Sequence, residues 1–115
     1  MDVETLRKIC LSFPAAQEDI KWEHDLAFTV GEKMFAVTSF DEPFKCSLKV
    51  ADDQFDEFTS REGFEPAPYL ARAKWVLVSN QSGMNKQQWE ELLRNSYELI
   101  AKKLTKKQRQ LLQIQ

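Results

Sequence analysis

The strict alternation of apolar and polar residues at positions 44–50 is the sequence feature that most constrains the fold of this chain. Positions 44, 46, 48 and 50 hold Phe, Cys, Leu and Val, and the positions between them hold Lys45, Ser47 and Lys49. Successive side chains of a β-strand point to opposite faces of the sheet. The pattern therefore predicts a strand with one buried face and a row of Lys, Ser and Lys on its outer face.

Two further β-rich runs, residues 26–30 and 34–38, precede this strand and are separated by Gly31 and Glu32. Glycine adopts a positive φ without strain, and a type II′ turn places one at its first central position. We therefore expect a tight hairpin over residues 26–39 with a type II′ turn. Residues 74–78 are apolar on both faces after Lys74, which predicts a fourth strand in the interior of the sheet.

Helical signals lie at both ends of the chain and after the third predicted strand. Apolar residues recur every three or four positions between Val3 and Phe13, which predicts an amphipathic helix ended by Pro14. Capping boxes at 85–88 and 105–108 predict a long helix that breaks and restarts as a short terminal one. Asp52 is expected to cap a short helix, and residues 64–70, with two prolines, are expected to form a loop.

The resulting element order is α-β-β-β-α-β-α with a short terminal helix. Strands grouped apart from the main helices favour an α+β two-layer sandwich with a mainly antiparallel sheet. A chain of 115 residues, 43% hydrophobic and 30% charged, suits one domain over residues 1–115 with one core. The apolar runs are short and the N-terminus is acidic, which predicts a cytoplasmic location without a membrane span. Cys10 and Cys46 occupy apolar positions and are expected to be reduced core residues.

Several short segments together resemble one known family. They are Trp22-Glu-His24, residues 28–36, Ser47-Leu-Lys49, residues 66–70, Lys74-Trp75-Val and Ser96-Tyr97. In this order and spacing they resemble the MmcQ/YjbR family over nearly the whole chain. The resemblance implies an α+β fold similar to that of type III secretion chaperones. It also implies DNA binding through a pair of wing-like hairpins, but it assigns no role to any of the matching residues.

The chain offers little chemistry of its own. His24 is the only histidine, and a transition-metal site needs three or four ligands, so no metal is expected. The acidic residues 52–57 suit the first turn of a helix better than acid–base catalysis. Ser79 and Ser82 lack the glycine context of a nucleophile elbow, and three glycines in all do not make a phosphate-binding loop. We predict no catalytic residue and no cofactor, and the enzymatic alternative ranks third.

The charged residues are distributed unevenly along the chain. Residues 1–65 carry 15 acidic and 7 basic side chains, whereas residues 66–115 carry 3 acidic and 9 basic ones. Such halves can form a surface for nucleic acid or can neutralise each other in the folded state. The candidate nucleic-acid-binding residues are Lys33, Lys45, Lys49, Arg72, Lys74, Lys102, Lys103, Lys106, Lys107 and Arg109.

Each cation also has a purely structural interpretation. Lysines on outward strand positions prevent aggregation of the sheet, and cations at a helix C-terminus are stabilised by the helix dipole. The leading hypothesis is a binding domain without enzymatic activity that binds DNA weakly through phosphate contacts. The alternative is a protein-interaction or chaperone-like adaptor, in which the sheet face or its edge receives a partner segment.

Overall fold

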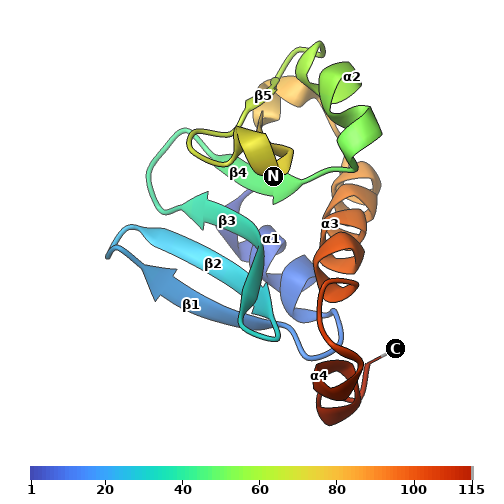
Figure 1. The fold of residues 1–115 in the computed structure, drawn as a ribbon. Coiled ribbons are helices and arrows are strands. Elements are labelled where there is room, and N and C mark those ends of the chain that lie inside the picture. The colour runs from blue at the N-terminus through green and yellow to red at the C-terminus, as the bar shows by residue number, and fades with distance from the viewer. Residues whose placement is uncertain (115) are drawn as a thin grey trace.

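The computed structural model, which describes residues 1–114, contains one six-stranded antiparallel sheet with α1 and α3 on the same face (Figure 1). The strands lie in the order β1-β2-β3-β4-β6-β5 across the sheet. Their bounds are β1 Gln17–Lys21, β2 Asp25–Val30, β3 Lys33–Ser39, β4 Lys45–Lys49, β5 Phe64–Pro66 and β6 Trp75–Ser79. The α+β sandwich predicted from the sequence is confirmed, with the predicted helices and strands in the predicted order.

Within residues 1–114, four α-helices accompany the sheet: α1 Val3–Leu11, α2 Phe55–Thr59, α3 Lys86–Ala101 and α4 Lys106–Leu111. Single turns of 3-10 helix cover Asp52–Gln54, Ala71–Ala73 and Asn80–Ser82. Both predicted capping boxes are formed, since Asn85 and Gln88, and likewise Thr105 and Gln108, exchange side-chain to backbone hydrogen bonds. The long helix therefore breaks and restarts as expected. The prediction for Asp52 was wrong, because Ala51 is the N-cap and Asp52 lies inside the 3-10 turn.

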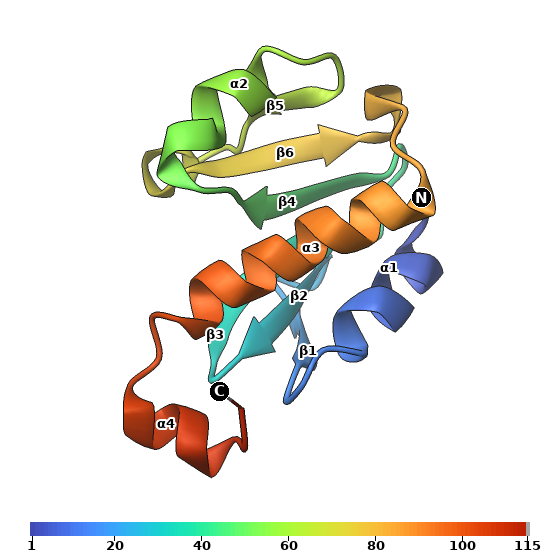
Figure 2. The same ribbon diagram turned by 90° about the vertical axis from the view of Figure 1, so that its right-hand side faces the viewer.

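The core lies between the sheet and the helices α1 and α3 (Figure 2). The apolar stripe of α3, from Trp89 to Ala101, is buried against the inward residues of β2, β3 and β4. Residues 44, 46, 48 and 50 are all buried, as their alternation predicted. Removing a large apolar side chain from water contributes about 1.5–3 kcal/mol, so these two faces stabilise the sandwich against each other.

The β2–β3 hairpin has a different turn from the predicted one. Gly31 and Glu32 both have positive φ, +56° and +68°, which is the signature of a type I′ turn rather than type II′. Type I′ matches the right-handed twist of the flanking strands, and here that geometry places a non-glycine residue in the left-handed region. The hairpin over residues 26–39 itself is confirmed.

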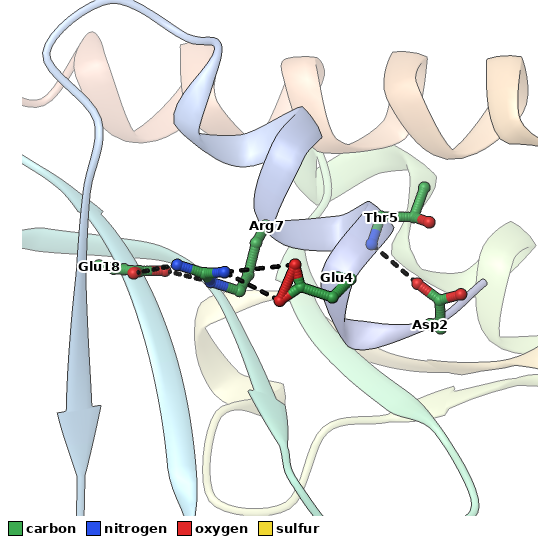
Figure 3. A network of polar contacts seen from close by, with 5 residues as sticks. All are labelled: Asp2, Glu4, Thr5, Arg7 and Glu18. Atoms are coloured by element: carbon green, nitrogen blue, oxygen red, sulfur yellow. Dashed lines mark hydrogen bonds and ion pairs between the residues drawn. The ribbon is translucent and has the colours of Figure 1, made fainter.

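Two strands, β1 and β5, were not predicted, and both are edge strands. Four of the five residues of β1 are exposed, and β5 is only three residues long and ends at Pro66, inside the segment expected to be a loop. A bidentate ion pair fastens β1 to α1: the Arg7 guanidinium donates to both carboxylate oxygens of Glu18, at 2.8 and 2.7 Å. Figure 3 shows the same guanidinium reaching Glu4, at 2.9 Å. Edge strand and first helix are thus joined by charge rather than by apolar packing.

Cys10 and Cys46 are both free and buried, as predicted. Burial raises the pKa of both thiols, that of Cys46 to about 12, so both remain protonated. In the part of the chain that the structure describes, no helix combines the length and apolar character needed to cross a membrane.

Candidate functional site: a basic end and an apolar groove

Cations from three parts of the chain gather at the end of the sheet that carries the β2–β3 turn. The connection from α3 to α4 reaches this turn, because a Cβ placed on Gly31 would lie 2.7 Å from Cδ2 of Leu104. β4 ends on the same side, where the Val50 N–H donates to the Lys74 carbonyl at 3.0 Å. Figure 2 shows the turn, the end of β4 and α4 on one side of the molecule. We call the following residues of this region the basic end: Lys33, Arg72, Lys74, Lys102, Lys103, Lys106, Lys107 and Arg109.

Most cations of the basic end face solvent. Lys74 and Arg109 are half-buried and the other six are exposed. Within residues 1–114, none of the eight forms an ion pair. Acidic neighbours are present nevertheless, since Asp52 and Asp53 line one hollow with Lys103 and Glu98 lines another with Lys102. The basic end is therefore a set of accessible cations with a few acids between them.

Lys74 is partly held by the protein itself. It ends the 3-10 turn at Ala71–Ala73 with a left-handed φ of +63°, and its ammonium lies 5.0 Å from the centre of the Phe55 ring. A cation–π contact of this kind contributes about 0.5–1 kcal/mol at an exposed site. The contact with Phe55 thus restrains the Lys74 side chain beside the C-terminal end of β4.

Lys49 does not lie on the outer surface, contrary to the alternation pattern. It is buried, with its ammonium donating to the Ala73 carbonyl at 2.5 Å and lying 3.7 Å from the Asp52 carboxylate. Burial lowers the pKa of Lys49, and the positive charge of Lys103 lowers it further, while Asp52 acts in the opposite direction. The 3-10 turn that supplies Ala73 covers this side chain. Lys49 therefore does not present its charge to a phosphate.

Lys45 is exposed but lies at the other end of β4, paired with Ser79. Five of the candidate cations, Lys33, Lys45, Lys49, Arg72 and Lys74, therefore do not lie together in one patch. Lys49 is buried, and Lys45 lies at the opposite end of β4. Lys33, Arg72 and Lys74 remain, and the structure adds to them the cations around α4.

The other polar candidates remain separate from one another. His24 is exposed, and its carbonyl accepts a hydrogen bond from the Phe40 N–H at 3.2 Å. Across residues 1–114, no group of three or more His, Cys, Asp or Glu side chains is placed to hold a metal ion. The acids of the 52–57 segment are exposed and follow one another through the 3-10 turn and α2.

A groove of about 550 Å³ lies on the sheet face opposite the core. Its floor includes Val37, Ser47 and Leu77, which are direct cross-strand partners on β3, β4 and β6. Their neighbours along each strand point into the core, so this row must point the other way. Met34 and Leu70 extend the apolar lining.

Two aromatic side chains stand at the groove, one from each of two separate connections. Trp22 belongs to the β1–β2 turn and is 72% exposed, and Tyr69 belongs to the β5–β6 connection and is fully exposed. Both have left-handed backbones, with φ of +51° and +66°. This conformation costs a bulky residue roughly 1–2 kcal/mol. The chain therefore accepts local strain at the two positions that place exposed rings at the groove.

No sequence pattern indicates this groove directly. Trp22 and Tyr69 belong to segments that carry the family resemblance, but neither lies in a pattern that predicts a site. A groove between two connections depends on which strands are neighbours. The only usable hint was an aromatic residue in a turn region, where Gly, Asn or Asp is the common choice.

Comparison with known proteins places the chain in a family. The family model described as YjbR matches residues 11–99. The crystal structure of the Deinococcus radiodurans protein DR2400 superposes with a TM-score of 0.87 at 30% sequence identity, covering 98% of this chain and 88% of that one. The crystal structure of a Pseudomonas syringae protein superposes with a TM-score of 0.73 at 16% identity, covering 87% of this chain and 99% of that one.

None of the curated proteins matches the chain. The Pseudomonas syringae structure, at its low identity, shows likeness of fold alone. The family match runs from the end of α1 to the C-terminal part of α3. It includes the β2–β3 hairpin, the groove and most of the core. The chain belongs to the YjbR family.

Proposed function

We propose that this protein is a binding domain that contacts DNA weakly through the basic end, without reading the base sequence. The observation that carries the proposal is the meeting of exposed cations from the start of β3, from the α3–α4 connection and from α4 at one side of the molecule. DNA carries a regular array of phosphates, and each lysine that neutralises one releases a counterion. Such contacts position a protein on the duplex without specifying sequence.

The acids between the cations support weak rather than tight binding. Glu98 lies beside Lys102, and Asp52 lies beside Lys103, so the local potential is lower than the count of lysines suggests. The sequence net charge of −2 adds long-range repulsion from DNA. Binding is therefore expected at low salt and should fall steeply as salt rises.

The adaptor alternative has less support at the sheet edges. β1 carries the charged residues Glu18, Asp19 and Lys21, and β5 is three residues long and ends at Pro66. Charges, short length and proline are the devices that protect an edge strand from pairing with another chain. Addition of a partner strand is therefore disfavoured at both edges. An enzymatic role also lacks support, because the exposed His24 is not part of the groove lining.

The test is fluorescence anisotropy of a labelled DNA duplex, with the wild-type protein and two triple variants. One variant carries Lys103→Gln, Lys106→Gln and Lys107→Gln at the basic end. The control carries Lys8→Gln, Lys21→Gln and Lys86→Gln on the opposite part of the molecule, so that both variants lose the same net charge.

The basic-end variant should bind more weakly, with the slope of log K against log salt reduced by about 0.9 for each phosphate that is no longer neutralised. The control variant should retain the wild-type slope. Absence of binding at about 50 mM salt, where phosphate contacts are strong, would overturn the proposal. Equal weakening in the two variants would also overturn it, because net charge alone would then explain the binding.

A further inference from the structure

The groove on the open sheet face has the size and lining of a small-molecule site. Its volume of about 550 Å³ falls within the range of roughly 300–1,000 Å³ typical of ligand pockets. The floor is apolar through Met34, Val37 and Leu77, and these side chains are only half-buried by the protein. Ligand pockets combine such an apolar lining with a few polar groups that fix orientation.

The aromatic residues at the groove have no packing role that explains their position. Trp22 and Tyr69 are absent from the core and are the two most exposed large apolar side chains apart from Leu111. Each of these residues has a backbone in the strained left-handed region. Left-handed backbone at non-glycine residues occurs in the turns of this chain, Glu32 among them, and is also found at ligand-binding positions in proteins. Both rings are free to pack on a flat apolar body that enters the groove.

A row of polar side chains crosses one end of the groove. Asp25 on β2 is the direct cross-strand partner of Ser39 on β3, and Lys45 on β4 follows the Cys46–Thr38 pair in the same register. Asp25, Ser39 and Lys45 all line the groove. Neighbouring strands are about 4.8 Å apart, so Asp25 and Lys45 stand on either side of Ser39.

Neither charge of this row has an ion-pair partner among residues 1–114. Lys21, the cross-strand neighbour of Asp25 on β1, is engaged instead by Asp19 at 3.0 Å. Within the described chain, the groove thus ends in one free carboxylate and one free ammonium, with a hydroxyl between them. The Ser39 hydroxyl already accepts a hydrogen bond from the Asp41 N–H at 3.1 Å, and its own proton remains available to a ligand. A ligand that pairs with both charges needs an anionic and a cationic group close together.

We propose that this groove binds a small zwitterion with a flat apolar body, of the chemical class of a free aromatic α-amino acid. The ligand ammonium lies against Asp25 and its carboxylate against Lys45, whose flexible four-carbon stem brings the charge toward Ser39. The ring packs on the apolar floor between Trp22 and Tyr69. This site is distinct from the basic end, and it stands whether or not the protein binds DNA.

The test uses L-phenylalanine as the probe and the fluorescence of Trp22 as the readout. Trp75 and Trp89 are buried, so a ligand in the groove changes the emission of Trp22 alone. Three analogues separate the contributions: phenylalanine amide lacks the carboxylate, N-acetyl-phenylalanine lacks the ammonium, and glycine lacks the ring. The first two also mimic the two ends of a peptide chain.

L-phenylalanine should give a saturable change, and each analogue should bind about tenfold or more weakly, because each lacks either a charged group or the ring. Lys45→Gln should abolish the preference for phenylalanine over its amide, and Asp25→Asn the preference over the N-acetyl form. Lys33 lies outside the groove lining, so Lys33→Gln serves as the control and should change neither preference.

The proposal is overturned if phenylalanine gives no saturable change up to about 10 mM, where even a millimolar site would fill. It is equally overturned if the amide or the N-acetyl form binds as tightly as the free amino acid, since the groove would then recognise a peptide end. Isothermal titration with the same ligands provides a readout that does not depend on Trp22.

Discussion

The hydroxyl of Ser96 accepts a hydrogen bond from the backbone N–H of Lys49 at 2.9 Å, which joins the middle of α3 to the end of β4. The same hydroxyl donates to the Phe35 carbonyl on β3 at 2.6 Å. β3 and β4 pair only as far as Ala36 and Leu48. Beyond that point a helix side chain satisfies the backbone groups that the sheet leaves unpaired.

Ser96→Ala should lower the free energy of unfolding by about 2–3 kcal/mol, because it leaves a buried N–H and a buried carbonyl without partners. Urea denaturation monitored by circular dichroism measures the destabilisation. Ser60→Ala, at an exposed helix end, is the matched control and should change stability by less than about 1 kcal/mol. Equal effects of the two substitutions would contradict the bridging role of Ser96.

Lys49→Met should alter how stability depends on pH in the alkaline range. The pKa of Lys49 is lowered in the folded state from its ordinary value of 10.5, first by burial and then by the charge of Lys103. Between the lowered pKa and 10.5, the unfolded chain binds more protons at this site, so the wild type gains stability as pH rises. The variant lacks that gain. Urea denaturation in steps from about pH 8 to pH 10.5 compares the two, and parallel curves would contradict the prediction.

Glu18→Gln should remove a contribution to stability that exists only above acidic pH. The hydrogen bonds from Arg7 lower the pKa of Glu18 below its ordinary value of 4.5. A carboxylate with a lowered folded-state pKa stabilises the protein above 4.5, and this stabilisation disappears as pH falls through the folded-state pKa.

Wild type and the Glu18→Gln variant should therefore differ in thermal stability at neutral pH and converge in acid. Glu65→Gln, an exposed carboxylate without an ion pair among residues 1–114, is the control and should follow the wild type at every pH. A constant difference across the acid range would show that the Arg7–Glu18 pair is not responsible.

Gly63→Ala and Gly83→Ala form a matched pair that separates backbone strain from steric exclusion. Both glycines have positive φ, +83° and +69°. A Cβ on Gly83 meets nothing within 4 Å, so that substitution should cost only the conformational strain of about 1–2 kcal/mol. A Cβ on Gly63 would lie 2.1 Å from the Ser82 backbone nitrogen. Gly63→Ala should therefore be far more destabilising in thermal denaturation, and similar melting temperatures would contradict this packing.

The parts of the fold that were predictable are those specified locally. The alternation at 44–50, the position but not the type of the turn at Gly31, and the capping boxes at Asn85 and Thr105 are each determined by residues within a few positions of one another. β1 was not predicted because four of its five residues are exposed, so its sequence shows no apolar alternation. β5 was not predicted because it is only three residues long and ends at Pro66. Their pairing is set by β2 and β6, which the sequence of the edge strand does not reveal.

The candidate site was less predictable, because it depends on contacts between distant segments. The alternation placed Lys49 on the outer face of its strand, but the side chain is buried and its ammonium donates to the carbonyl of Ala73, in a turn 24 residues later. The exposed cations around α4 were identified from the sequence, since a charged terminal helix is visible in the residues alone. The proximity of these cations to Lys33 could not be predicted from the sequence, because it depends on the contact between Leu104 and the β2–β3 turn.

That leucine, Leu104, fixes the spacing of the positive charges. Because it fills the space beside Gly31, the α3–α4 connection and the β2–β3 turn form one packed unit, and the contact joins the two backbone segments that carry the lysines. A flexible basic tail must be ordered each time it meets a polyanion, and ordering each long side chain or segment weakens binding. Here the backbone carrying the charges is ordered during folding, so the protein presents a preformed array rather than a tail.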